Sequence, residues 1–188
     1  KRFSVAHELG HWKYHRGRSF VCRKEDIGNQ VRSAADPERI ADTYAADLLL
    51  PPYLFAPLAA KTKKATFEAI DSIRAEFQTS RTATALRMVD YGPEPAMLIC
   101  HGPQKRLWFK RGPGVPDRWF PRDDLDAESP AFEVLHGKTD RTPRTLIGAD
   151  AWFDRRGSDQ FEVFEQTVRT ASGGSLTLLT FKSAEMLN

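Results

Sequence analysis

The stretch His7-Glu8-Leu9-Gly10-His11 is an H-E-x-x-H motif near the start of the sequence. Residues four apart lie one turn above each other on a helix, so the rings of His7 and His11 can share one metal ion. Glu8 lies beside them and can take a proton from a metal-bound water without binding the ion itself. Gly10 leaves room for another segment to approach closely. The motif therefore predicts a zinc-binding helix over about residues 3–14.

The flanking residues support this helix. Ser4 is the expected N-cap, and Gly17 follows the expected end. Apolar residues recur at helical spacing, at Val5, Leu9 and Trp12. Short motifs also recur by chance, so the alternative is a surface helix with two incidental histidines. The small residues Ala6 and Gly10 beside the histidines favour the metal site.

A catalytic zinc site needs a third protein ligand and an open position. His15 lies one turn beyond His11, but at about 1.5 Å of rise per residue it is about 12 Å from His7 along the axis. It is therefore too distant to share the ion, and we expect it to be exposed. His101 and His136, in the second half of the chain, are remote candidates.

A second helix offers a better third ligand. Asp36-Pro37 predicts its start, with an aspartate as N-cap and a proline in the first turn. Glu38 lies in that first turn, and Asp42 follows one turn later on the same face. We favour Glu38 as the ligand and Asp42 as the acceptor of the other ring N–H of a ligand histidine. Glu38 could instead only complement the helix dipole, and Asp42 and Asp47 remain alternative third ligands.

The composition is that of an ordinary soluble globular chain, with 188 residues, 40% hydrophobic, 28% charged and a net charge of +3. Such a small net charge does not by itself imply nucleic acid. Cys22 and Cys100 lie far apart and outside C-x-x-C spacing, which argues against a disulfide framework and favours a reducing cytosol. No apolar run approaches the ~20 residues that a membrane span needs.

The pattern changes near Tyr91. Further helices are expected over 67–77 and 80–90, and strands over 96–100, 107–110, 161–168 and 176–181. We therefore expect an α+β fold, with a zincin-like helical core and a helix-turn-helix-like pair at 1–92. A strand-rich C-terminal module at 93–188 follows, with a sensory or substrate-positioning role by analogy. H-E-x-x-H enzymes normally place a sheet before this helix, so we expect an upstream sheet to be missing.

The helix pair has two interpretations. Arg81 and Arg87 lie on what would be a recognition helix, which would suit DNA binding. The structural interpretation, which we favour because the net charge is weak, is that apolar residues pack the pair against the metal-binding helices. Those residues are Ile70, Ile73, Phe77 and Leu86. The aromatic residues of the second half are interpreted as the core of a small sheet.

Two longer segments carry a family resemblance. The first is Arg2-Phe3-Ser4-Val5-Ala6-His7-Glu8-Leu9-Gly10-His11, and the second is Glu38-Arg39-Ile40-Ala41-Asp42-Thr43-Tyr44-Ala45-Ala46-Asp47-Leu48-Leu49-Leu50-Pro51. Together they resemble the ImmA/IrrE metallopeptidases, whose pattern is R-F-[ST]-x-A-H-E-x-G-H followed by E-x-x-A-[ND]-x-[FY]-A-x-x-L-L-x-P. The front quarter matches closely, and the helix pair up to Gly92 matches more loosely.

The resemblance implies one zinc ion per chain, with His7, His11 and Glu38 as ligands and Glu8 as the catalytic carboxylate. Asp42 takes the position that is Asn or Asp in the family. Such proteins are typically cytosolic endopeptidases of bacteria or phages that cleave a partner helix-turn-helix repressor, in stress, phage or mobile-element responses.

The main hypothesis is therefore peptide-bond hydrolysis by a zinc-bound water, with Glu8 as general base and then acid. Tyr14, Tyr44 and His136 are candidate oxyanion helpers, and the spacing selects none of them. Two alternatives remain: a DNA-binding regulator that retains a zinc site, and a catalytically incomplete module that binds a repressor without cutting it.

Overall fold

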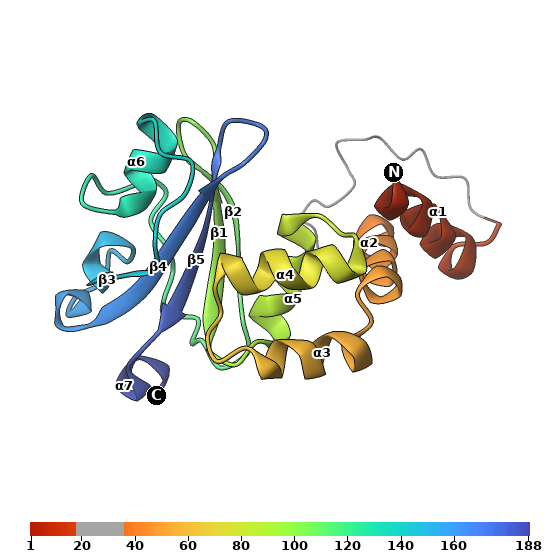
Figure 1. Cartoon of the computed structure of the whole chain (residues 1–188), viewed down its shortest axis with the longest axis horizontal. Helices are drawn as coiled ribbons and strands as arrows, with labels where there is room; N and C mark the ends of the chain where they lie inside the picture. Colours follow the sequence, from red (N-terminus) through yellow and green to blue (C-terminus); the bar gives the residue numbers. More distant parts are fainter. Residues whose placement is uncertain (18–35) are drawn as a thin grey trace.

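The computed structural model describes residues 1–17 and 36–188, and Figure 1 shows how they are arranged. The described part of the chain has five helices before its first strand: α1 (Arg2–Tyr14), α2 (Pro37–Leu49), α3 (Pro52–Lys61), α4 (Phe67–Phe77) and α5 (Arg81–Tyr91). A sheet follows, accompanied by α6 (Pro130–His136), α7 (Ala184–Leu187) and the short 3-10 turns Ala149–Ala151 and Ser158–Gln160. The fold is α+β, as the sequence predicts.

The start and the buried face of α1 differ from the expectation. The helix begins at Arg2, and Ser4 is not its N-cap, because the N–H of Val5 already bonds the carbonyl of Lys1 at 3.1 Å. The apolar stripe is exposed, and 61% of Trp12 is accessible. The buried residues of this helix are Ala6, His7, Gly10 and His11. The motif thus occupies the helix interface, where apolar side chains usually lie.

Helix α2 begins as predicted. The side chain of Asp36 accepts a hydrogen bond from the N–H of Glu38 at 2.9 Å, and Pro37 holds the first helical position. The sequence predicts no helix directly after it, yet α3 begins at Pro52. Pro52 occupies the first position of α3, where a proline is well tolerated. Pro57 lies inside α3, and an internal proline usually argues against a helix, so the sequence does not predict this one.

The sheet is antiparallel throughout, with the strand order β2-β1-β5-β4-β3. Its strands are β1 (Ala96–His101), β2 (Arg106–Arg111), β3 (Thr145–Gly148), β4 (Glu162–Arg169) and β5 (Ser175–Phe181). Every predicted strand end lies within one residue of the observed one. The strand β3 and the helix α6 are too short to give a periodic signal, and the sequence does not predict them.

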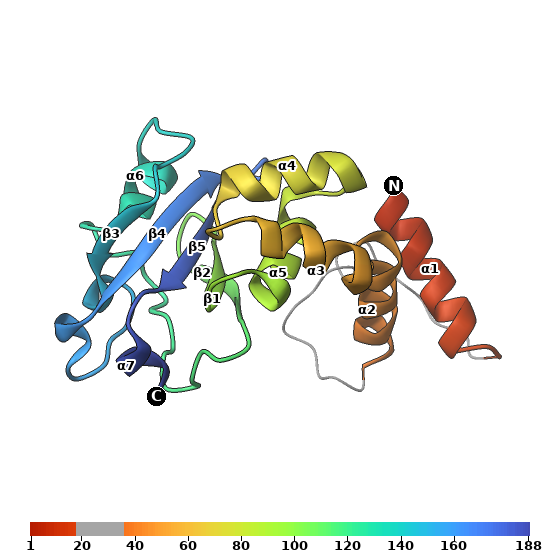
Figure 2. The ribbon, with the colours of Figure 1, turned by 60° about the horizontal axis from the view of Figure 1, so that its bottom comes forward.

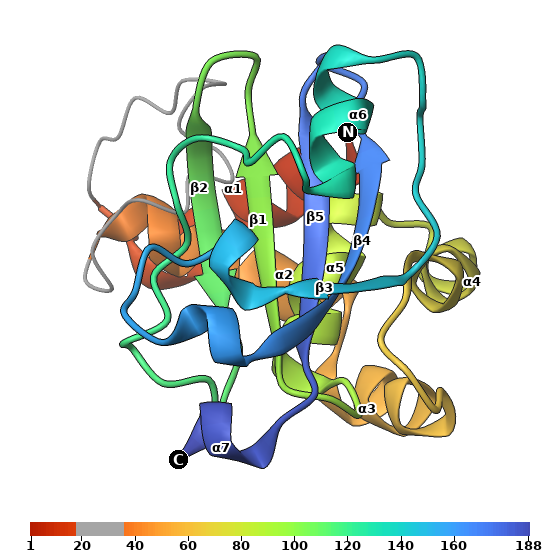
Figure 3. The same cartoon turned by 90° about the vertical axis from the view of Figure 1, so that its left-hand side faces the viewer.

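Both faces of the sheet are covered. Alternate residues of β1 point to opposite sides, so Leu98 joins a core with helices α3, α4 and α5. Ile99 joins a second core, in which Trp119, Trp152 and Phe153 are buried. Figure 3 shows α6 and β3 in front of this second face. The aromatic residues of the second half therefore serve mainly as core, as expected.

Helices α3, α4 and α5 lie between the sheet and the α1–α2 pair, as the views in Figures 1 and 2 agree. Ile70 and Ile73 belong to the core that these helices share with the sheet. Phe77 and Leu86 pack against the same core, which includes Leu50 at the end of α2 but is otherwise formed with α3 and the sheet. The expectation that these four residues pack the pair against α1 and α2 therefore holds only at the end of α2. The division at residue 92 stays a prediction. Among the described helices, none is long and apolar enough to cross a membrane.

Candidate metal centre

Helices α1 and α2 approach each other closely at a glycine. A Cβ atom on Gly10 would lie 2.9 Å from Cα and 3.1 Å from the carbonyl oxygen of Ala41. Ala41 and Ala45 are fully buried on the facing side of α2. The sequence interpretation that Gly10 admits a close neighbour is therefore confirmed, and this neighbour is the helix that carries Glu38.

The close crossing brings together the two histidines of the motif and Glu38, the first-turn glutamate of α2. Nε2 of His7 lies 3.1 Å from Nε2 of His11. The carboxylate of Glu38 spans both rings, with Oε2 at 3.2 Å from Nε2 of His7 and Oε1 at 3.3 Å from Nε2 of His11. All three side chains are buried. Two ring nitrogens and one carboxylate, from two helices, thus lie close enough together to hold one metal ion.

The donor set and its spacing suit a zinc ion. A tetrahedral ion with ligands at about 2.0–2.1 Å holds neighbouring ligand atoms about 3.3 Å apart. The two Nε2 atoms lie 3.1 Å apart, and each lies 3.2 or 3.3 Å from a different oxygen of Glu38, so all of these separations are close to that edge length. Two neutral imidazoles and one carboxylate are a ligand set of catalytic zinc sites, which leave a fourth position open. The residues present therefore fit the ion that the sequence predicts.

Asp42 lies where a residue that orients His7 would be needed. Its Oδ1 lies 2.9 Å from Nδ1 of His7, on the ring edge opposite the converging Nε2 atoms. A carboxylate at this position accepts the Nδ1–H and leaves the lone pair of Nε2 free for a metal. Asp42 is thus placed behind His7 rather than among the three converging atoms.

His15 departs from the expectation. It is buried, with 9% of its surface accessible, and its Nδ1 lies 3.2 Å from Nδ1 of His11. The expectation of an exposed side chain is therefore wrong. The spacing in the sequence already indicates that His15 lies on the same helix face as His7 and His11, because it follows His11 by four residues, as His11 follows His7.

Glu8 and Asp47 occupy different places. Glu8 is exposed and follows His7 in α1. Asp47, one of the alternative third ligands, forms an ion pair with Arg87 of α5 and does not join the converging group. Arg87 is buried, and its pairing with Asp47, which joins α5 to α2, has no local signal in the sequence.

Other candidates lie elsewhere in the fold. His101 is buried on the sheet face beside Trp152, and burial together with the charge of Arg106 lowers its pKa to about 4. His136 is on α6, on the far side of the sheet from α1 and α2 (Figure 1). Neither is near the converging group.

Tyr14 and Tyr44 pack against each other, with ring centroids 5.8 Å apart, at the α1–α2 contact.

Cys100, the cysteine within the described residues, does not add to the site. Cys100 is buried in the first core, and burial raises the pKa of its thiol to about 11, so it stays protonated and inert. Cys22, the other cysteine, lies outside the described residues.

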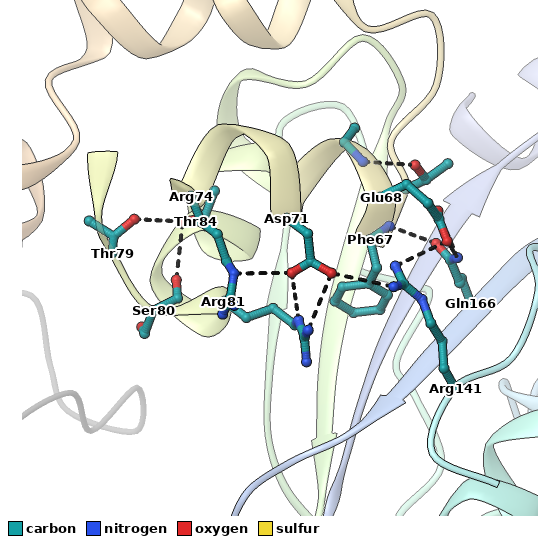
Figure 4. Close-up of polar contacts among 12 residues, drawn as sticks. Phe67, Glu68, Asp71, Arg74, Thr79, Ser80, Arg81, Thr84, Arg141 and Gln166 are labelled. Carbon is teal, nitrogen blue, oxygen red and sulfur yellow. Dashed lines mark hydrogen bonds and ion pairs between the residues drawn. The ribbon is translucent and has the colours of Figure 1, made fainter. Parts of the chain in front are cut away.

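Basic side chains of the helix-turn-helix-like pair form ion pairs within the chain, and Figure 4 shows those of Arg74 and Arg81 with Asp71. Arg81 donates two hydrogen bonds to the carboxylate of Asp71, at 2.8 and 3.2 Å. Arg141, which precedes β3, reaches Glu68 at 3.0 Å and Asp71 at 3.4 Å. With Arg87 held by Asp47, both arginines that suggested a DNA contact have carboxylate partners within the chain.

Arg2 joins α1 to the helix-turn-helix-like pair by hydrogen bonds. Nη1 of Arg2 donates to the carbonyl oxygens of Phe77 and Gln78 at 3.2 and 3.3 Å, and to the side chain of Gln78 at 3.2 Å. Gln78 ends α4 in the left-handed conformation, with φ of 52°. A cation at a helix C-terminus is favourable, so Arg2 links α1 to the end of α4.

The comparison with known families agrees with this geometry. Residues 1–89 match the model of a peptidase family, Peptidase_M78, described as the IrrE N-terminal-like domain. The match contains all three residues of the converging group and ends within α5. A search of curated proteins finds no match.

Proposed function

Since residues 1–89 belong to the ImmA/IrrE family of metallopeptidases, we propose that this chain is a zinc-dependent endopeptidase. The single observation that carries the proposal is the convergence of His7, His11 and Glu38 at the spacing of a tetrahedral ion. These three side chains would hold one zinc ion per chain, and Asp42 would orient His7 from behind.

The chemistry divides between the ion and the chain. Zinc bound at such a site lowers the pKa of water to about 7 and polarises the carbonyl of the peptide bond. Glu8 takes a proton from the attacking water and returns it to the leaving amine. This role is supported by its place next to His7 on the same helix and by its exposure. His7, His11 and Glu38 are buried, so their orientation is fixed before a substrate arrives.

The proposed substrate is a helix-turn-helix transcriptional repressor, cleaved in the cytosol during a stress, phage or mobile-element response. Its support is the family resemblance of the two segments around the metal centre. The internal ion pairs of Arg81 and Arg87 favour a protein substrate over DNA as the partner. The chain would then act on the regulator rather than on its operator.

The proposal is tested by a comparison of wild type with Glu8→Gln, which keeps the three proposed ligands and removes the proton carrier. Both proteins are loaded with one equivalent of zinc and incubated with a proteome-derived peptide library, and new N-termini are identified by mass spectrometry. We expect new N-termini from wild type alone. Equal products from both zinc-loaded proteins, or none from either, would count against hydrolysis by this centre.

A binding assay separates the non-cleaving alternative. Helix-turn-helix repressors are immobilised, and zinc-loaded wild type is passed over them. Capture of the protein with an intact repressor would support the repressor-binding module instead of the peptidase.

A further inference from the structure

We propose that His15 is a positioning residue of the metal centre, which accepts the Nδ1–H of His11 and so directs Nε2 of His11 at the ion. The inference rests on the proposed function, because it takes His7, His11 and Glu38 as the ligands. It adds a residue outside that ligand set, which lies one turn beyond the H-E-x-x-H motif.

The contact is specific and shielded from solvent. The two Nδ1 atoms lie 3.2 Å apart, and the ring centroids of His11 and His15 lie 5.2 Å apart with an interplanar angle of 48°. The backbone N–H of His15 also bonds the carbonyl of His11 at 2.8 Å, which closes the last turn of α1. Both side chains are more than nine-tenths buried. The helix thus fixes the backbone of His15, and the contact with Nδ1 of His11 places its ring.

The geometry of His11 determines where its proton lies. Its Nε2 faces Nε2 of His7 at 3.1 Å and Oε1 of Glu38 at 3.3 Å, so this nitrogen must offer a lone pair when a cation is bound. The proton of the neutral ring is then on Nδ1. The atom opposite it, at 3.2 Å, is Nδ1 of His15, which must be the acceptor. His15 consequently carries its own proton on Nε2.

Each proposed histidine ligand then has a different acceptor behind it. His7 has the carboxylate of Asp42 at 2.9 Å, and His11 has the imidazole of His15 at 3.2 Å. A metal-bound histidine almost always donates its second ring N–H, and the acceptor fixes both the tautomer and the ring orientation. A neutral acceptor does this without adding another negative charge beside Glu38 and Asp42. The two histidine ligands are thus held by one charged and one neutral partner.

The test uses two substitutions that separate the acceptor from the bulk of the ring. His15→Asn keeps an oxygen near the position of Nδ1, whereas His15→Phe keeps a ring and removes the acceptor. Zinc affinity is measured by competition with a chromophoric chelator, and thermal unfolding of the zinc-free proteins checks that each variant folds. We expect His15→Phe to weaken zinc binding about 10- to 100-fold and His15→Asn to recover most of that loss.

Tautomers give a second readout. In long-range proton–nitrogen NMR spectra of the zinc-loaded wild type, we expect His11 protonated on Nδ1 and His15 on Nε2. Wild-type zinc affinity in His15→Phe, equal losses in both variants, or a His15 protonated on Nδ1 would overturn the proposal.

A ligand variant distinguishes failure of this inference from failure of the proposed function. If Glu38→Ala loses zinc and His15→Phe keeps it, the proposed ligand set is supported and only the proposed role of His15 is rejected. If wild type binds no zinc, both fall together.

Discussion

Nδ1 of His7 lies 2.9 Å from Oδ1 of Asp42, one helical turn beyond Glu38 on α2. The same helix thus supplies a carboxylate in front of His7 and another behind it. Glu38 faces Nε2 at 3.2 Å, and Asp42 faces the opposite nitrogen. This arrangement needs both helices at once, so the metal centre depends on the α1–α2 contact as much as on the motif.

Replacement of Asp42 should weaken metal binding without abolishing it. Asp42→Ala leaves the Nδ1–H of His7 without its carboxylate, and we expect zinc affinity to fall about 10- to 100-fold. Asp42→Asn should lose less, because its amide oxygen can still accept. Chelator competition measures both, with Thr43→Ala, an exposed neighbour on α2, as the matched control. A loss of all zinc in Asp42→Ala would instead make Asp42 a ligand.

The Gly10→Ala variant tests the close helix crossing. The added Cβ would meet backbone atoms of Ala41 at 2.9 and 3.1 Å, and backbone cannot move aside as a flexible side chain can. We expect a loss of roughly 1–3 kcal/mol in the free energy of unfolding, together with weaker zinc binding. Urea denaturation and zinc titration measure the two effects. Ser4→Ala, at an exposed position of α1, is the control that should change neither.

The ion pair of Arg87 with Asp47 separates a structural role from a DNA-binding one. Arg87→Ala removes a buried guanidinium, although Asp47 itself is 50% exposed, so we expect only a modest fall in melting temperature. Binding of duplex DNA at low salt should not change, because Arg87 and Arg81 are each already paired with a carboxylate of the chain. Thermal melts and fluorescence anisotropy measure these outcomes. Salt-sensitive DNA binding that Arg81→Ala and Arg87→Ala both weaken would support the alternative hypothesis of a DNA-binding regulator.

The predictable and unpredictable parts of this protein differ in physical origin. The cap of α2 at Asp36 and the four longer strands follow from local chemistry and alternation, so the sequence predicts them. The place of Glu38 opposite the motif also follows, since one turn of a helix determines which face it shares with Asp42.

Other features depend on the tertiary arrangement. The apolar stripe of α1 predicts the wrong buried face, because the face that packs on α2 carries His7, Gly10 and His11 instead. Nothing local indicates that Arg2 reaches the end of α4 or that Arg87 reaches Asp47. These contacts join residues that are distant in the sequence, and only the arrangement of five helices and a sheet brings them together.

The ion-pair network of α4 should make the protein sensitive to acid. Partial burial raises the pKa of Asp71, but the hydrogen bond and charge of Arg81, with Arg74 and Arg141 nearby, outweigh this and lower it below 3.8. A lowered pKa contributes stability that is present above the unfolded value and is lost as pH falls through the folded value. We therefore expect stability to fall below about pH 4, and less steeply in Asp71→Asn. Urea denaturation across this range measures the slope, and an unchanged slope in the variant would contradict the assignment.

Glu165 should have the opposite dependence on pH. It is fully buried on the second face of the sheet, and burial raises its pKa even though Trp152, Ser129 and the N–H of Ala131 donate to it at 2.7 to 2.9 Å. A raised pKa means that the folded state holds its proton to higher pH than the unfolded state, so stability declines as pH rises from 4.5 through the folded value.

The test measures the free energy of unfolding of Glu165→Gln and wild type from pH 4.5 upward. The variant lowers stability at every pH, because an amide cannot accept all of these donors, but its slope in this range should be flatter than that of wild type. Parallel curves would show that Glu165 is ionised throughout and that its donors outweigh its burial.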